Sequence, residues 1–350
     1  MLETPSPIAE AAMEGPAGAG REGALAERLD TAGGLPAVSE VERLFAQDGI
    51  RKAAIAPDWP GLLGEARRLG EVRSVARNAH AIHKSWGTYG ALRGGGEVGL
   101  VINGGIDLRM FFGAWKHAYI VEAPCGDATQ LSLQICDGTG DAVQKIFPET
   151  SAGMNVLREW AGRYGVSAGT PVVVPAPASS PERPDSAIDA TALLTEWQGL
   201  KDVHHFRALL ARHGAGRTQA LRLARGRFAE RVGNDALARI LAGAHDHCVP
   251  LMVFLANRGI VQIHSGTIGA CEHADGWLHL TDPEFHLHLR EAGIAESWVV
   301  TKPTADGPVT SLELYDAAGE TVLQLFGVRS EGMAENPAWQ VLAHSMAVAS

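Results

Sequence analysis

The sequence predicts an α+β protein that is a tandem structural duplication, with helices and a large antiparallel β-sheet in each half. The main observation is an internal repeat at an offset of 179 residues, where LSLQICDGTGDAVQKIF (131–147) aligns with TSLELYDAAGETVLQLF (310–326). Both segments read as strand, turn and strand. Helix signals come first in each half and no strand–helix–strand alternation follows, so the sheets should be antiparallel.

The composition divides the chain into four segments. Residues 1–30 are rich in Ala, Gly, Glu and Pro, and we expect them to form a disordered tail. Residues 31–166 should form the first repeat and residues 191–350 the second. The segment 167–190 holds five prolines among Ser, Ala and charged residues. Such a composition sustains neither a helix nor a central strand, so we interpret this segment as a linker.

Shorter matches extend the repeat to other elements. The capping-box pattern of Ser39 and Glu42 predicts that a helix begins the first half. Residues 62–70 align with residues 240–248. In the middle of each half, RNAHAIH aligns with RGIVQIH at an offset of 181, which predicts two small insertions in the second half.

The composition is that of a folded protein that works in water. The 350 residues are 46% hydrophobic, and the longest nearly uninterrupted apolar stretch, residues 249–256, is well short of a membrane-spanning helix and should be a core strand. The formal net charge of -10 argues against binding to nucleic-acid phosphates. Four cysteines without CxxC spacing suit a reducing compartment. We therefore expect a cytoplasmic protein with no membrane insertion and no nucleic-acid partner.

Residues 193–214 have the apolar spacing of one helix that ends at Gly214. On this helix His204 would share a face with small and apolar neighbours, and His205 would point about 100° away. A half-buried, hydrogen-bonded histidine is the simpler interpretation. The alternative is an axial ligand of a metal or of haem iron, because imidazole is the usual proximal ligand of haem.

Residues 107–112 read as a strand whose side chains alternate between two faces. Asp107, Arg109 and Phe111 share one of these faces. Arg109 beside Phe111 offers a fixed cation and a flat ring, which suits a planar anionic ligand. An ion pair between Arg109 and Asp107 is the alternative.

Two His-x-His pairs raise the question of a metal site. His286 and His288 alternate with apolar residues and should lie on one face of a strand, and His245 and His247 repeat the spacing. No carboxylate or cysteine stands at a ligand spacing around either pair, so a structural zinc is not expected. The sequence also lacks GxSxG, GxxxxGK[ST] and HExxH, which leaves hydrolase and nucleotide-binding functions without support.

Several stretches resemble the bacterial hemin-degrading factor family, of the HemS, ChuS and PhuS type. They are LKDVHHFRALL, VFLANRGIVQIHSG, RNAHAIHKSWG and the long block IAESWVVTKPTADGPVTSLEL (294–314). The resemblance runs from about residue 35 to the end of the chain. It implies a tandem duplication, in agreement with the internal repeat, and haem b (hemin) as the ligand in a cleft between the halves.

The resemblance also implies roles on the two faces of the haem. His204, in the DVH motif, would be the proximal ligand of the iron. On the other face of the haem, Arg109 would hold a water or hydroxide at the iron, and Phe111 would lie beside it. Arg109 and His204 would therefore be the catalytic residues of an enzyme. His205 would be the alternate ligand. His83 matches the position of an additional site, although a structural role is the simpler interpretation.

Around the haem edge, basic and polar residues would bind the two propionates, because charge-assisted hydrogen bonds to carboxylates are strong. By the same resemblance these residues are Arg217, Lys302, Gln324 and Arg329. Phe326 stands where many relatives have an aromatic hydroxyl, which would remove one hydrogen bond to a propionate.

Two functions would use these same residues. The first is an enzyme that opens the haem ring oxidatively and releases iron, with electrons from an external donor such as a reductase. The second is a haem chaperone, downstream of a haem importer, that passes haem to a separate haem oxygenase. We favour degradation, although the residues support either function. A zinc-dependent or DNA-binding regulator is the weakest interpretation.

Overall fold

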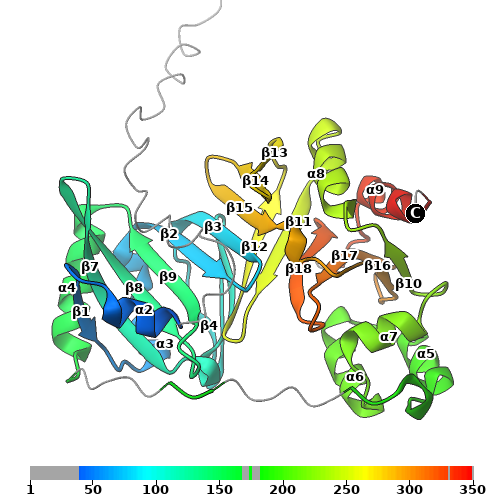
Figure 1. Cartoon of the computed structure of the whole chain (residues 1–350), viewed down its shortest axis with the longest axis horizontal. Helices are drawn as coiled ribbons and strands as arrows, with labels where there is room; N and C mark the ends of the chain where they lie inside the picture. The colour runs from blue at the N-terminus through cyan, green and yellow to red at the C-terminus, as the bar shows by residue number, and fades with distance from the viewer. Residues whose placement is uncertain (1–38, 168–172, 176–181, 330–331, 349–350) are drawn as a thin grey trace, which may run out of the picture.

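The computed structural model in Figure 1 describes residues 39–167, 173–175, 182–329 and 332–348. The predicted tail, residues 1–30, and parts of the predicted linker lie outside the described residues. No helix in the described ranges is long and apolar enough to cross a membrane.

The first half begins with short helices and a strand, continues as a series of antiparallel strands, and closes with a helix. Its described helical segments are α2 (Glu40–Ala46), α3 (Trp59–Gly64), η1 (Ala66–Leu69), η2 (Phe112–Ala114) and α4 (Ser151–Tyr164). Its described strands are β1 (Arg51–Ala54), β2 (Glu71–Arg77), β3 (Ala81–Thr88), β4 (Arg93–Gly95), β5 (Val98–Asn103), β6 (Ile106–Phe111), β7 (His117–Cys125), β8 (Ala128–Cys136) and β9 (Ala142–Pro148).

The second half repeats this order and adds helices at its start. Its described helical segments are η3 (Asp185–Ala187), α5 (Ala190–Gln198), η4 (Val203–His205), α6 (Phe206–His213), α7 (Arg217–Leu223), α8 (Ala236–Asp246), η5 (Glu291–Gly293) and α9 (Pro337–Val348). Its described strands are β10 (Ala229–Val232), β11 (Leu251–Ala256), β12 (Ile260–Gly266), β13 (Cys271–Ala274), β14 (Trp277–Thr281), β15 (Phe285–Arg290), β16 (Glu296–Lys302), β17 (Val309–Tyr315) and β18 (Thr321–Gly327).

The strands form two nine-stranded antiparallel sheets, and each sheet takes strands from both halves. One has the order β1-β7-β8-β9-β2-β3-β15-β14-β13, and the other has the order β10-β16-β17-β18-β11-β12-β6-β5-β4. The two halves therefore exchange equivalent three-stranded segments, β4–β6 and β13–β15, at the centre of the molecule (Figure 1). The predicted α+β class and tandem duplication are confirmed. The exchange was not predicted.

The same hydrogen bonds between an asparagine side chain and the backbone recur at a constant offset of 179 residues. Asn78 donates from Nδ2 to the carbonyl of Val322 at 2.8 Å, and Asn257 donates from Nδ2 to the carbonyl of Val143 at 2.8 Å. Each asparagine side-chain oxygen accepts the backbone N–H groups two and three residues further along the chain. These turns make Asn78 equivalent to Asn257, so the predicted offset of 181 is wrong and no insertion separates the two segments.

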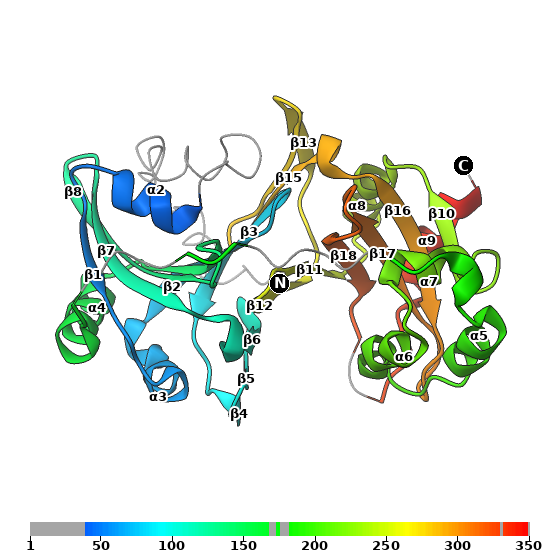
Figure 2. The same ribbon diagram turned by 60° about the horizontal axis from the view of Figure 1, so that its bottom comes forward.

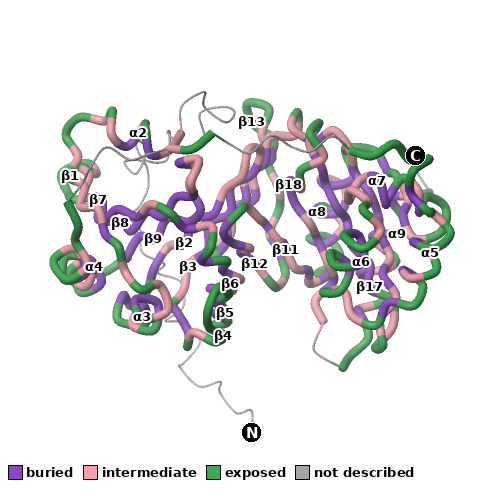
Figure 3. The backbone as a smooth tube through the Cα atoms, turned by 90° about the horizontal axis from the view of Figure 1, so that it is seen from below, coloured by how far each residue is buried: buried purple, intermediate pink, exposed green. Residues whose placement is uncertain are grey.

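One hydrophobic core runs across both halves. The largest cluster of buried side chains includes Leu133 from the first half and Leu312 from the second. The closing helices α4 and α9, which were not predicted, are anchored by the equivalent tryptophans Trp160 and Trp339, both fully buried. Figure 3 shows buried stretches running through the central strands. Because the core is shared, the halves support one another.

The single helix predicted over residues 193–214 is wrong. The helix α5 ends at Gln198, with Gly199 as its C-cap, and α6 begins only at Phe206. Between them the side chain of Asp202 accepts the backbone N–H of His204 at 2.9 Å, which caps the turn η4. A glycine followed by an Asp cap favours a helix end and a new start over continuation. His204 therefore lies in a turn between two helices.

Candidate functional site

His204 presents an accessible imidazole at the start of α6. Its side chain is 82% exposed, and its Nδ1 lies 2.6 Å from Oδ1 of Asp202. The same carboxylate oxygen also accepts the backbone N–H of His204. The carboxylate therefore holds Nδ1 and leaves Nε2 as the nitrogen that a metal would take. This differs from the expected neutral imidazole on an apolar helix face.

Asp202 is a functional candidate that the sequence analysis missed. The hydrogen bond from the backbone of His204 lowers the pKa of the Asp202 carboxyl, so this group stays ionised. A carboxylate bound to the second nitrogen of a histidine ligand fixes the ring orientation and increases its basicity. The available signal was the Asp two residues before His204, which is a helix-cap pattern.

A half-exposed face of the second sheet forms the next part of the site. Directly opposed residues in a sheet share a face, so the register places Gln324 beside Phe254 and Phe326 beside Met252. All four side chains are partly exposed. The rings of Phe254 and Phe326 lie 4.9 Å apart between centroids. This surface is broad and mostly apolar, with Gln324 as a polar group on it.

The strand β6 of the first half extends this face. Arg109 pairs with Val261 of β12, while Leu108 and Met110 on the opposite side are fully buried. The predicted alternation of β6 is therefore confirmed, and Phe111 is 36% exposed. In Figure 2, β4, β5 and β6 stand on one side of this face and α6, which follows His204, stands on the other.

Arg109 makes the ion pair that was the alternative interpretation. Its Nη1 contacts Oδ1 of Asp107. Burial raises the pKa of Asp107, while Arg109 acts in the opposite direction. The pair employs one guanidinium nitrogen, and the Arg109 side chain stays 36% exposed. Because β6 is hydrogen-bonded into the second sheet, Arg109 and Phe111 belong to the same sheet as Gln324 and Phe326, and no gap between separate domains divides them.

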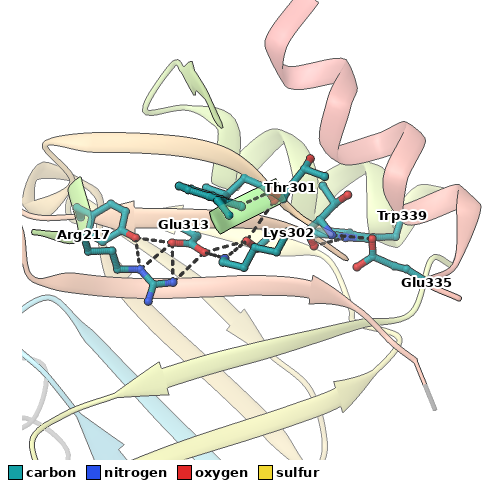
Figure 4. A network of polar contacts seen from close by, with 11 residues as sticks. Arg217, Thr301, Lys302, Glu313, Glu335 and Trp339 are labelled. Carbon is teal, nitrogen blue, oxygen red and sulfur yellow. Dashed lines mark hydrogen bonds and ion pairs between the residues drawn. The ribbon is translucent and has the colours of Figure 1, made fainter. Parts of the chain in front are cut away.

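Arg217 and Lys302 meet at a buried carboxylate that the sequence analysis missed (Figure 4). Glu313 has no exposed surface, and Nη2 of Arg217 lies 2.9 Å from its Oε2. Nζ of Lys302 donates to Oε1 of Glu313 at 2.6 Å. The hydroxyl of Tyr315 also donates to Glu313 and accepts from Nε of Arg217 at 2.7 Å. Two cations thus share one carboxylate, so these three side chains together carry one net positive charge, and the more distant Glu335 adds a negative charge that acts on Lys302.

The pKa values of this network follow from burial and pairing. Burial favours the neutral acid, but Arg217 and Lys302 together hold the pKa of Glu313 well below its usual range. Burial lowers the pKa of Lys302, and Glu313 counteracts that effect. Burial and the neighbouring carboxylate raise the pKa of Tyr315, which stays a neutral phenol. Both cations also lie over the ring of Phe206 at the start of α6, Lys302 at 4.9 Å and Arg217 at 5.5 Å from its centroid.

A cavity of about 780 Å³ opens between the halves beside this network. Arg207, Leu210 and Arg217 line it from the second half, and Asn78 and His80 line it from the first. His204, Arg109 and Phe111 are not among the residues that line it. The cavity therefore adjoins the candidate site at Arg217.

The remaining predicted residues are more dispersed. Arg329 follows the end of β18 and is half-exposed. His205 lines a hollow between α5 and α6 that His204 does not line, and its charge, like that of His204, lowers the pKa of Asp202. His83 is fully buried in β3, where its Nε2 lies 3.0 Å from the hydroxyl of Ser85. Burial lowers the pKa of His83 strongly, which fits the structural interpretation of this residue.

The His-x-His pairs differ in setting. His286 and His288 lie on β15 as predicted, whereas His245 and His247 lie at the end of α8. In the described ranges, no three His, Cys, Asp or Glu side chains are arranged as a complete metal site.

Comparison with known proteins agrees with the repeat and with the fold. The Haemin-degrading HemS.ChuX domain matches residues 37–164 and again residues 214–346. The chain belongs to this family. The hemin transport protein HmuS of Yersinia pestis is 33% identical over 307 residues, which cover 87% of this chain and 89% of HmuS.

Two solved structures of the family are similar over most of their length. Apo-PhuS, a heme-binding protein from Pseudomonas aeruginosa, is 40% identical with a TM-score of 0.82, and the match covers 88% of this chain and 91% of PhuS. ChuS, an E. coli heme oxygenase, is 35% identical with a TM-score of 0.79, and the match covers 88% of this chain and 92% of ChuS. The two HemS.ChuX segments include Arg109, Arg217 and Lys302, whereas His204 lies between them.

Proposed function

We propose that this protein is a cytoplasmic haem-binding protein of haem uptake and iron acquisition, with His204 as the axial ligand of haem b. The observation that carries the proposal is the exposed His204 imidazole, whose Nδ1 is held by Asp202 so that Nε2 remains for iron. Neutral imidazole held in this way is the common proximal ligand of haem.

The neighbouring sheet face fits a flat, mostly apolar macrocycle. Met252, Phe254 and Phe326 supply half-exposed apolar surface, and Phe111 adds an exposed ring at the far edge. Aromatic and aliphatic side chains of this kind bury large ligand area at little cost in ordering. The haem would lie along this face, with His204 approaching the iron from α6.

The buried network fits the propionates of haem. Arg217 and Lys302 carry one positive charge more than Glu313 neutralises, and a carboxylate of the ligand would balance it. Gln324, on the same sheet face, and Arg329, just beyond β18, would serve as further propionate donors. Phe326 has no hydroxyl and would contribute apolar contact only.

Oxidative degradation of bound haem is the favoured activity, and it would release the iron. Arg109 retains donors beyond the one paired with Asp107, and these would hold a water or an oxygen ligand at the iron. The oxygen chemistry belongs to haem itself as the substrate, while this chain would bind and orient it. Support comes from ChuS, which is described as a heme oxygenase. An external electron donor, such as a reductase, would be required.

A haem chaperone is the alternative. Its support is that His204 is 82% exposed, so the ligand has a short path for exchange, and that HmuS is described as a hemin transport protein. In this function the protein would receive haem downstream of an importer and pass it to a separate haem oxygenase.

Titration with hemin tests the ligand assignment. The full chain should give a 1:1 complex, and its Soret band should be lost or strongly shifted in His204→Ala. His205→Ala is the matched control, because it removes the neighbouring imidazole and should leave the spectrum nearly unchanged. An unaltered complex in His204→Ala would refute the assignment.

Adding ascorbate or a reductase, with catalase present, separates the two functions. An enzyme should lose the Soret band and release iron in a reaction that catalase does not suppress. A chaperone should keep the haem spectrum under these conditions and should transfer haem to an added haem oxygenase.

A further inference from the structure

The exchanged segment β13–β15 carries histidines on one face that the haem site does not use. His279 of β14 and His288 of β15 are directly opposed across the strands. Their Nδ1 atoms lie 2.8 Å apart, and their ring centroids lie 5.0 Å apart. Within this segment the sequence pattern indicated the pair His286 and His288 but not His279, because the strand that contributes His279 is brought alongside by folding.

The two rings lie on the face of the segment opposite its leucines, with Nε2 of His288 buried. The residues that alternate with them, Leu278, Leu280, Leu287 and Leu289, are fully buried and face the core. Both histidines are partly exposed. The leucines fix the two strands in register, and the two imidazoles share a hydrogen bond between their Nδ1 atoms, which a bound metal ion would replace.

The spacing of the rings is close to that of two ligands of one metal ion. Imidazole nitrogens bound to an ion at about 2.05 Å and at about 90–110° to one another lie about 2.9–3.4 Å apart. The Nδ1 atoms of His279 and His288 would therefore have to separate only slightly to admit an ion. We propose that His279 and His288, with the carboxylate of Glu272, bind a divalent first-row transition-metal ion.

The strand β13 supplies the third ligand. Glu272 is the direct partner of His279 in the β13–β14 pair, so Glu272, His279 and His288 form a row across three strands on one face. Opposed Cβ atoms lie about 5 Å apart, within the reach of a glutamate side chain. Glu272 is exposed and can reorient. This movement is needed because no three such side chains in the described ranges are already arranged as a metal site.

His286 fits the third position less well. Its ring lies 6.0 Å from that of His288 and packs against Trp86 at 4.6 Å. It is also directly opposed to Lys84 of β3, whose positive charge would repel a cation. The row that ends at Glu272 extends away from β3, because the strand order is β3-β15-β14-β13.

Two imidazoles and one carboxylate are the donor set that suits Zn²⁺, Co²⁺, Ni²⁺ or Fe²⁺ rather than Ca²⁺ or Mg²⁺. The site is separate from His204 and does not depend on the proposed haem function. It would bind the ion on the surface of β13–β15, with water completing the coordination.

Calorimetric titration with Zn²⁺ tests the proposal, with the full, haem-free chain lacking any histidine tag. The wild type should bind Zn²⁺, and His279→Ala and His288→Ala should each weaken that binding by about tenfold or more. Glu272→Gln should weaken it by a smaller factor. His273→Ala is the matched control, because this exposed neighbour pairs with Glu291 and should leave Zn²⁺ affinity unchanged.

Co²⁺ provides a second measurement, since its visible d–d bands report nitrogen and oxygen ligands directly. These bands should be absent or altered in His279→Gln, which keeps a polar side chain and so guards against loss of the strand pair. The proposal is overturned if the wild type binds no Zn²⁺ at 100-fold excess. It is equally overturned if binding is lost only in the double variant His204→Ala/His205→Ala.

Discussion

Replacing Glu313 with Gln removes the charge at the centre of the buried network. Glu313 is fully buried and contacts Arg217 at 2.9 Å and Lys302 at 2.6 Å. Without the carboxylate charge, the buried Lys302 and the partly exposed Arg217 lose the counter-charge that they share. Breaking a buried ion pair costs about 3–5 kcal/mol of unfolding free energy. Because the side chain of Arg217 is 31% exposed and keeps contact with water, we place the expected cost at the lower end of this range, about 3 kcal/mol.

The effect should depend on pH in a definite direction. The pKa of Glu313 is lower in the folded protein than in the unfolded chain, where a glutamate titrates near about 4.3. The stabilisation is therefore complete above that value and is lost as the pH falls towards the folded pKa. The difference between wild type and Glu313→Gln should be constant from about pH 6 to 8 and should shrink below about pH 4.

Urea unfolding followed by circular dichroism measures this difference. Glu196→Gln is the matched control, because Glu196 pairs with Arg212 and His213 while 38% exposed. Its loss should cost less than about 1 kcal/mol. A Glu313→Gln variant within about 1 kcal/mol of the wild type at pH 7, or a difference that persists undiminished at pH 3, would refute the account of the network.

Three further variants probe other parts of the structure. Asp202→Asn should weaken hemin binding by about tenfold and shift the haem midpoint potential upwards, because the His204 imidazole becomes less basic; equal affinity and potential in potentiometric titration would show that Asp202 does not act on the ligand. Asn257→Ala should lower the unfolding free energy by about 1–3 kcal/mol in urea, because it removes hydrogen bonds to Arg77 and Val143; an unchanged midpoint would contradict the role of this turn. Gly259→Ala should lower the unfolding free energy by about 1–3 kcal/mol in the same assay, because a Cβ there would lie 2.6 Å from the side chain of Val143. An unchanged unfolding free energy would mean that the turn before β12 or the side chain of Val143 moves to make room.

Much of the fold could be predicted because the duplication is visible in the sequence itself. The exchange of β4–β6 and β13–β15 could not be predicted. A strand such as β6 shows the same alternation of Asp107, Leu108 and Arg109 whichever sheet it joins, so local pattern carries no information on its partner. Similarly, a matching Arg and His in two segments gave an offset of 181, whereas the asparagine turns set the register at 179.

For the candidate site, the sequence predicted correctly those features that depend only on a residue's position within its own strand. Arg109 and Phe111 follow from strand alternation, and their orientation is confirmed. Glu313 looked like an ordinary polar position on a strand, and only its burial beside Arg217 and Lys302 in the folded chain identifies it as the centre of an ion-pair network. The turn around His204 was missed because the apolar spacing continued through Gly199, and the cap formed by Asp202 outweighed it.

The most direct test of the haem proposal is rescue of His204→Gly by free imidazole. If His204 supplies the axial nitrogen, the variant should show a weakened, altered Soret spectrum with hemin, and added imidazole should restore the wild-type spectrum in a saturable way. A variant with the wild-type spectrum before imidazole is added would contradict the assignment of His204 as the ligand.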